Sequence, residues 1–271
     1  MKSKRPAPQQ GTLMLIGGAE DKFEQKVILR MFVQLSGGPR ARLSILPSAS
    51  ENHDSGAIYQ QIFSELGARI VRVLPLFNHE EADLPDVAKE LASSTGIFMT
   101  GGDQSKIVRI LHGTRALSAI EAAYARGAVI AGTSAGAAAL SDPMIASGGR
   151  GSLARSGMAK IAQGLGLTRS LLIDQHFHQR ERLGRLIAAV ISFPQMLGVG
   201  VDEDTAAVVN DGQLSVIGRG TVTLIDTSQV RSVNLGTTPD RSPLAFANLR
   251  LHTLVHGGRF DLQRRQVIFK E

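Results

Sequence analysis

The sequence contains no cysteine, few aromatic residues and no long apolar run, and each absence narrows the class of protein it encodes. Without cysteine the chain has no disulfide, no thiol nucleophile and no thiolate metal site. No apolar stretch approaches the roughly 18 residues of a membrane span. Residues 1–10 are polar and lack the apolar core of a signal peptide, so we expect a short disordered lead on a cytoplasmic protein.

The chain carries a net charge of +6, while aromatic residues make up only 4% of it. The basic residues are scattered, and their densest groups are Arg180, Arg182 and Arg185, and Arg264 with Arg265. No basic stretch alternates with aromatics to form a stacking surface for nucleic acid. The charge therefore favours capture of an anionic substrate over nucleic-acid binding.

The hydrophobic fraction of 43% is enough for a folded core, and it is arranged as short apolar runs that alternate with amphipathic segments. Apolar runs that end in glycine predict strands, and the segments between them have helical periodicity. We expect strands at 13–16, 43–46, 70–73, 97–100 and 128–131, and helices at 22–35, 57–66, 82–91, 107–111 and 117–125. This alternation predicts an α/β fold, with an open, mostly parallel sheet and helices on both faces.

After residue 140 the pattern changes. Residues 147–152 are typical of a flexible loop, and they precede an expected strand at 171–173 and a helix at 181–190. Short strands at 198–201 and 206–209 follow, and alternating segments at 213–226 and 249–269 predict β-hairpins near the C-terminus. Because no repeat or linker interrupts the chain, we expect a single α/β domain over residues 11–271.

Ser134 lies in Gly132-Thr133-Ser134-Ala135-Gly136, directly after an apolar run and before a run of small residues. A strand, a Gly-x-Ser-x-Gly turn and a helix start are the pattern of a nucleophile elbow, which exposes a serine at the end of a strand. The alternative is an ordinary strand-to-helix turn in which Ser134 is a helix N-cap. The flanking strand and helix favour the catalytic interpretation.

A serine nucleophile needs a general base, and His176 and His178 are the best candidates because they follow the expected strand at 171–173. That strand end predicts a place on the same sheet edge as Ser134, but position alone does not choose between the two histidines. Asp174 lies two residues before His176 and projects to the same side in an extended backbone. The alternatives are two surface-loop histidines, or a metal site built on Asp-x-His-x-His.

Three carboxylates are candidates for the acid that orients the base: Asp142, Asp174 and Glu203. Glu203 lies in an acidic run that would also suit a solvated turn. Gly101 and Gly102 end another strand, where glycine allows a backbone N–H to approach a substrate oxygen. The same glycines fit a simple tight turn, with Asp103 as a helix N-cap and Gln104 in the first turn of the helix.

Several blocks together resemble the cyanophycinase group of the dipeptidase E family of serine peptidases. They span nearly the whole chain, and they are Gly17-Gly18-Ala19-Glu20-Asp21-Lys22, Gly101-Gly102-Asp103-Gln104, Gly132-Thr133-Ser134-Ala135-Gly136-Ala137, Asp174-Gln175-His176-Phe177 and Arg180-x-Arg182-x-x-Arg185. The resemblance implies hydrolysis of cyanophycin, a poly-aspartate chain with arginine on each β-carboxyl, to β-aspartyl-arginine dipeptides. It also implies a fold similar to class I glutamine amidotransferases, and commonly a homodimer. We expect no cofactor and no metal, because no second carboxylate–histidine cluster completes a metal site.

The resemblance further implies roles for individual residues. Ser134 is the nucleophile, His176 is the base, and the N–H groups of Ala135 and Gly102 (or Gly101) form the oxyanion hole. The residues implied in substrate binding are Gln104, Asp174, Gln175, Arg180, Arg182 and Arg185. Some family members have an acid between the serine and the histidine, but the matching residues 147–157 contain none, so we expect Glu203 to complete the triad.

Two other functions fit parts of the same pattern. One is an aspartyl dipeptidase, or another hydrolase of short acidic peptides from the same family. The other is a non-catalytic or amidotransferase-like binding module, although the absence of cysteine at residue 134 argues against amidotransfer.

Overall fold

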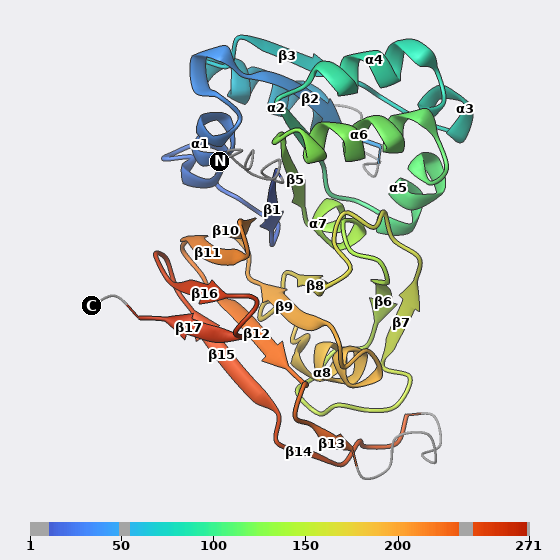
Figure 1. Ribbon diagram of the computed structural model, residues 1–271, viewed down its shortest axis with the longest axis vertical. Coiled ribbons are helices and arrows are strands. Elements are labelled where there is room, and N and C mark those ends of the chain that lie inside the picture. The colour runs from blue at the N-terminus through green and yellow to red at the C-terminus, as the bar shows by residue number, and fades with distance from the viewer. Residues whose placement is uncertain (1–10, 49–54, 233–240, 270–271) are drawn as a thin grey trace, which may run out of the picture.

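The protein is described by a computed structural model, in which residues 11–48, 55–232 and 241–269 are placed well enough to interpret. The expected disordered lead at 1–10 lies outside these residues. Figure 1 shows an upper part in which helices cover a sheet, and a lower part dominated by strands. None of the helices in the described ranges is long and apolar enough to cross a membrane.

The described residues form a nine-stranded sheet whose first five strands in chain order pair in parallel with one another, whereas every other pairing in the sheet is antiparallel. In spatial order it consists of β17 (Gln266–Ile268), β16 (Arg259–Asp261), β11 (Gln213–Gly218), β10 (Thr205–Asn210), β1 (Thr12–Ile16), β5 (Val129–Thr133), β4 (Gly96–Met99), β2 (Arg42–Leu46) and β3 (Ile70–Val73). The expected α/β class and the mostly parallel sheet are confirmed, and β16 pairs with β17 as a hairpin within the expected segment 249–269.

A second sheet packs below the first and has four strands. They are β15 (Arg250–Leu254), β12 (Val222–Asp226), β9 (Leu197–Val201) and β8 (Leu171–Gln175), of which only β8 and β9 are parallel. Two small two-stranded sheets pair β6 (Met144–Gly148) with β7 (Ala159–Ala162), and β13 (Arg231–Ser232) with β14 (Phe246–Ala247).

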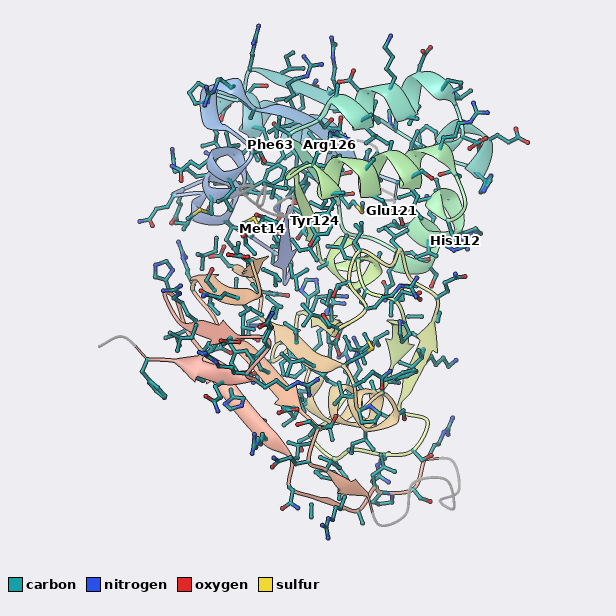
Figure 2. All side chains as sticks on the ribbon, in the orientation of Figure 1. Met14, Phe63, His112, Glu121, Tyr124 and Arg126 are labelled. Atoms are coloured by element: carbon teal, nitrogen blue, oxygen red, sulfur yellow. The ribbon has the colours of Figure 1, made fainter. Side chains whose placement is uncertain are left out.

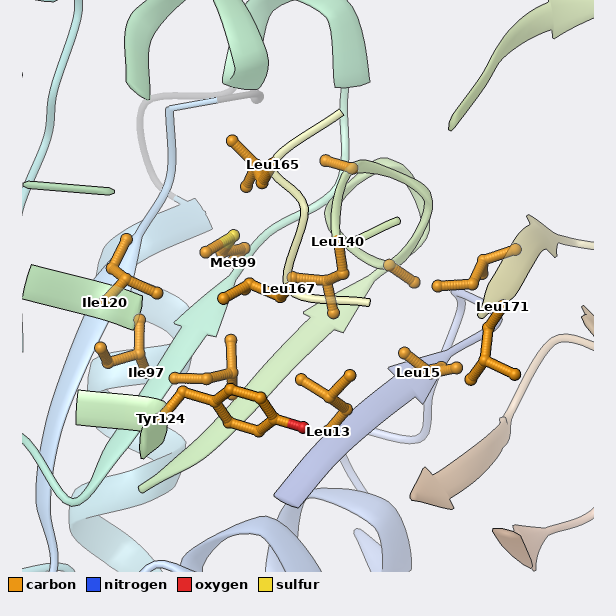
Figure 3. Close-up of a cluster of buried hydrophobic side chains, with 14 of the residues drawn as sticks. Leu13, Leu15, Ile97, Met99, Ile120, Tyr124, Leu140, Leu165, Leu167 and Leu171 are labelled. Atoms are coloured by element: carbon orange, nitrogen blue, oxygen red, sulfur yellow. The ribbon is translucent and has the colours of Figure 1, made fainter. Parts of the chain in front are cut away.

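Helices cover both faces of the large sheet because side chains alternate along each strand. In β1, Leu13 and Leu15 join one apolar cluster, while Met14 joins the other with Phe63. Figure 3 shows the first cluster, and Figure 2 labels Met14 and Phe63 from the second. The helices are α1 (Val27–Leu35), η1 (Gly38–Arg40), α2 (Ser55–Glu65), α3 (His79–Ala82), α4 (Pro85–Ser93), α5 (Gln104–Leu111), α6 (Arg115–Ala125), α7 (Ala135–Ala139) and α8 (Leu183–Ser192).

Two expected helices were wrong in extent. The helix expected from residue 22 begins only at Val27, because the Asp21 carboxylate accepts the backbone N–H groups of Phe23, Glu24 and Lys26 and holds a turn there. The helix expected at 82–91 is divided into α3 and α4, since Pro85 starts a new helix.

Two further expectations, for residues 147–152 and 213–226, were wrong about β-structure. Residues 147–152, expected as a flexible loop, include the end of β6 and the start of the connection to β7. The segment 213–226 does contain two strands, but they do not pair with each other. β11 pairs with β10 and β16 in the large sheet, whereas β12 pairs with β9 and β15 in the second.

Candidate active site

Ser134 lies in the sharp turn between β5 and α7, with backbone angles of φ 53° and ψ −116°. The turn requires glycine on both sides, since a Cβ on Gly132 would lie 2.3 Å from the carbonyl carbon of Gly136. A Cβ on Gly136 would lie 2.4 Å from the carbonyl oxygen of Met99. Ser134 occupies the N-cap position of α7 but its side chain makes no capping hydrogen bond. Its hydroxyl is therefore free for other partners.

The Ser134 hydroxyl lies at one end of a chain of three side chains. Ser134 Oγ is 2.8 Å from His176 Nε2, and His176 Nδ1 is 2.5 Å from Glu203 Oε1. An ionised carboxylate only accepts hydrogen bonds, so the proton of a neutral imidazole belongs on Nδ1. Nε2 is then the acceptor for the Ser134 proton, which is the arrangement that a general base needs.

The strand that carries His176 is not in the same sheet as Ser134, contrary to our expectation of a shared edge. His176 follows β8, a strand of the second sheet, and its own φ of 46° turns the ring toward Ser134. Its backbone N–H donates to the carbonyl of Gly17 at 2.8 Å, at the end of β1. The two sheets therefore meet at the site, and each provides one member of the pair.

Burial lowers the pKa of His176 below its usual value of 6.5. The hydrogen bond that His176 donates to Glu203 and the charge of that carboxylate raise the pKa, while the charges of Arg180 and Arg182 lower it further. The ring is consequently neutral at pH 7 and able to accept a proton.

The three neighbouring acids after β9 have separate partners. Asp202 accepts a hydrogen bond from His178 Nδ1 at 2.8 Å, while Asp204 accepts the backbone N–H of Asp21 at 2.8 Å. Only Glu203 contacts His176. Asp142, another candidate for the orienting acid, pairs with Arg169 instead, and its Oδ2 lies 3.3 Å from Arg169 Nη1. The structure thus distinguishes His176 from His178, and Glu203 from the other candidates.

A cavity of about 480 Å³ opens beside Ser134. Among the expected substrate-binding residues, five line it: Gln104, Gln175, Arg180, Arg182 and Arg185. Gln175 Oε1 also lies 3.3 Å from Ser134 Oγ. None of the described lining residues is acidic, so the cavity suits an anionic group.

Asp174 does not line this cavity, although we expected it to bind substrate. Its carboxylate is fully buried and receives Arg185 through two hydrogen bonds, Nε to Oδ2 at 2.7 Å and Nη2 to Oδ1 at 2.5 Å. Arg182 donates to the same Oδ1 at 3.2 Å. Burial lowers the pKa of Arg182 to about 10, so its guanidinium keeps its charge at pH 7. Asp174 therefore holds the two arginines in place from behind.

The glycine segment before α5 is followed by a helix N-cap, and it also lies close to Ser134. Asp103 caps α5 by accepting the N–H of Ser105 at 2.8 Å. A Cβ on Gly101 would lie 3.6 Å from Ser134 Oγ, so this turn borders the serine. Among the described residues, neither the Gly102 N–H nor the Ala135 N–H has a backbone acceptor. Gln104 uses its amide to hold β6, donating to the carbonyls of Ile145 and Ala146.

Two residues at the site were given no role by the sequence. Glu20 is 3% exposed and accepts a hydrogen bond from Thr133 Oγ1 at 2.6 Å, directly before the serine. It also accepts the Tyr59 hydroxyl, and the burial of Tyr59 and the charge of Glu20 raise the pKa of that phenol well above 10. Gly18 packs against the His176 ring: a Cβ there would lie 2.4 Å from His176 Cε1. Both belong to the Gly17–Lys22 block, but nothing in its composition showed what it would contact.

Replacing Gly18 with alanine is expected to displace the His176 ring and lower kcat/KM by at least about 100-fold, because the base would lose its contact with Ser134. The matched control is Gly67→Ala. Gly67 has a similar φ, +89° against +98°, but a Cβ there meets nothing within 4 Å. Steady-state kinetics and thermal melting of both variants separate the two effects. Equal activity in the two variants would contradict the role given to Gly18.

Comparison with known proteins shows where the chain belongs. Residues 13–217 match the model of peptidase family S51. A cyanophycinase from Trichormus variabilis is 40% identical over 271 residues, covering 99% of this chain and 91% of the relative. A cyanophycinase from Synechococcus elongatus is 42% identical over 264 residues, covering 96% of this chain and 82% of the relative. A crystal structure of a peptidase from an acI-B1 Actinobacterium has the same fold, with a TM-score of 0.69 at 20% identity, covering 94% of this chain and 98% of that one.

Proposed function

The chain belongs to peptidase family S51, and we propose that Ser134, His176 and Glu203 carry out its reaction as nucleophile, base and orienting acid. It is a serine-type peptidase, and its similarity to curated cyanophycinases over nearly its whole length assigns it cyanophycinase function. The observation that carries the residue assignment is the unbroken contact from Ser134 Oγ through His176 to Glu203 Oε1.

In the first half of the proposed reaction, Ser134 Oγ attacks a backbone carbonyl carbon of the poly-aspartate chain while His176 Nε2 takes its proton. The Ala135 and Gly102 N–H groups stabilise the negative oxygen as an oxyanion hole. In this mechanism the Ser134 turn acts as a nucleophile elbow. The carbon–nitrogen bond then breaks. His176 gives its proton to the departing amine, and Ser134 is left as an ester.

In the second half, water attacks the ester while His176 Nε2 again accepts a proton. The intermediate releases the new carboxylate, and the proton returns to Ser134. Glu203 holds the Nδ1 proton throughout, so the imidazolium that forms in each half is stabilised by a carboxylate 2.5 Å away. Arg180, Arg182 and Arg185 suit the free α-carboxylate of the arginine attached to the unit being cleaved.

The proposal is tested by the rates of cleavage of two substrates. Purified protein is expected to clear a suspension of insoluble cyanophycin, and to cleave it with a higher kcat/KM than a dipeptide with N-terminal aspartate. A much faster reaction with the dipeptide would favour the aspartyl dipeptidase alternative. A folded sample that cleaves neither would leave only a binding module.

The pH dependence should follow the charge of His176. The base is active when neutral, so kcat/KM is expected to fall as the pH drops through the pKa of His176, with a midpoint below 6.5. Because Glu203 raises this pKa and Arg180 lowers it, Glu203→Gln should move the midpoint down and Arg180→Gln should move it up. Profiles measured with a soluble substrate test this, and a midpoint that neither variant moves would contradict the assignment of the titrating group.

We retain two further expectations as part of the proposal, a cytoplasmic location and a homodimer. The dimer is tested by light scattering during size-exclusion chromatography, where a mass near twice that of one chain is expected.

A further inference from the structure

A second groove lies beside the catalytic cavity. It has a volume of about 710 Å³, within the range of pockets that hold drug-sized molecules. Four cationic residues line it, and these are Arg150, Arg155, Lys160 and Arg241. None of the described residues that line it is acidic, and none of these four pairs with a described carboxylate.

The groove is continuous with the catalytic cavity because Ser147, Gly148 and Arg150 line both. Gly148 lies at the junction: a Cβ there would be 2.5 Å from the Met158 carbonyl oxygen and 3.3 Å from Arg185 Cδ. A side chain at this position would collide with the Met158 backbone just before β7 and crowd Arg185, so the close packing at the junction requires glycine. Figure 1 shows β6 and β7, which carry part of the groove, on the same flank as α8.

Backbone hydrogen bonds fix the wall of the groove between two segments far apart in the sequence. Arg241 N–H donates to the Ser156 carbonyl at 3.0 Å, and Leu244 N–H donates to the Ala154 carbonyl at 3.0 Å. Arg155 Nη1 adds a bond to the Arg241 carbonyl at 3.1 Å. The exposed cations of the groove thus project from a hydrogen-bonded backbone frame, so their Cα positions are fixed before a ligand binds.

We propose that this groove is an extension of the substrate site, and that it binds the free α-carboxylates of arginyl units beyond those flanking the cleaved bond. This inference rests on the proposed cyanophycinase function. Each unit of the polymer carries one carboxylate and one guanidinium. Four unpaired cations without an acid attract the carboxylate and repel the guanidinium, so the guanidinium groups face the solvent. The groove therefore favours longer substrates, because each further unit adds a carboxylate that its cations can bind.

The test compares soluble oligomers of two and eight β-aspartyl-arginine units. The wild type is expected to have a KM about tenfold lower for the eight-unit oligomer, with similar kcat. In the variant Arg155→Glu/Lys160→Glu this advantage should be lost, while the kinetics with the two-unit oligomer stay within about twofold of wild type. Lys160→Glu alone keeps the Arg155 bond to Arg241, and it should lose part of the advantage without any loss of thermal stability.

The control is the double variant Arg72→Glu/Lys89→Glu, which changes the net charge equally at exposed positions on β3 and α4. It should keep the length advantage. An eight-unit oligomer whose arginine carboxylates are amidated should lose the advantage in the wild type, since nothing remains for the cations to bind.

The outcomes separate the two proposals. If the wild type cleaves both oligomers but the groove variants affect them equally or not at all, the groove proposal is wrong and the cyanophycinase function stands. If the amidated eight-unit oligomer keeps its lower KM, the groove does not bind the substrate through carboxylates, and the groove proposal is wrong. If the folded wild type cleaves neither oligomer, the proposed function fails, and the groove proposal with it.

Discussion

Replacing Ser134 with alanine is expected to lower the rate of cyanophycin cleavage by about 10⁴- to 10⁶-fold, because no other group can form the ester. The change removes one oxygen atom whose hydrogen bonds within the described part of the chain are to His176 Nε2 and Gln175 Oε1. Alanine has no Cγ or larger group to clash with the turn. The melting temperature should therefore remain within a few degrees of wild type.

The measurement is kcat for a soluble oligomer, with circular dichroism to verify folding. The matched control is Ser105→Ala, a nearby serine at the start of α5 whose side chain makes no hydrogen bond to the site. This control should keep wild-type activity. Activity of Ser134→Ala within tenfold of wild type would remove Ser134 from the role of nucleophile.

Replacing Asp174 with asparagine is expected to cost about 3–5 kcal/mol of the free energy of unfolding, because it leaves two buried guanidinium charges without their counterion. Asp174 is 0% exposed, Arg182 is 8% exposed and Arg185 is 5% exposed, so water cannot replace the lost carboxylate. For a chain of this size, the loss corresponds to a fall in melting temperature of roughly 10 °C.

Urea unfolding measures this effect, and Glu24→Gln is its control. Glu24 also faces an arginine, with Oε2 3.2 Å from Arg219 Nη2, but both side chains are mostly exposed. The solvent screens that pair, and its loss should cost less than about 1 kcal/mol. A cost for Asp174→Asn as small as that of the control would contradict the structural role given to the buried carboxylate.

Ser134 and Asp174 illustrate how much of the site could be predicted from the sequence alone. Ser134 was predictable because its signal is local: an apolar run, two glycines and a run of small residues occupy consecutive positions. Asp174 was identified as a residue near the site, but its partners Arg182 and Arg185 lie eight and eleven residues later in the sequence. The sequence shows that these charges are present, and it does not show which carboxylate they bind or that the pair is buried.

The same limit explains the departures in the fold. The parallel strands were predictable because each is a buried apolar run, whereas sheet membership depends on contacts between distant segments. β8 and β12 were therefore identified as strands without any sign that they form a second sheet. Gly18 shows the limit at a single residue, since its contact with His176 spans more than 150 positions.

The most direct test of the account is the mass spectrum of the soluble products released from cyanophycin by the wild-type protein. If the triad cleaves the poly-aspartate backbone, the product is the β-aspartyl-arginine dipeptide, and it is absent from a parallel reaction with Ser134→Ala. Release of free arginine would mean that the side-chain amide is cleaved instead. That result, or dipeptide formation by the alanine variant at the wild-type rate, would contradict the mechanism.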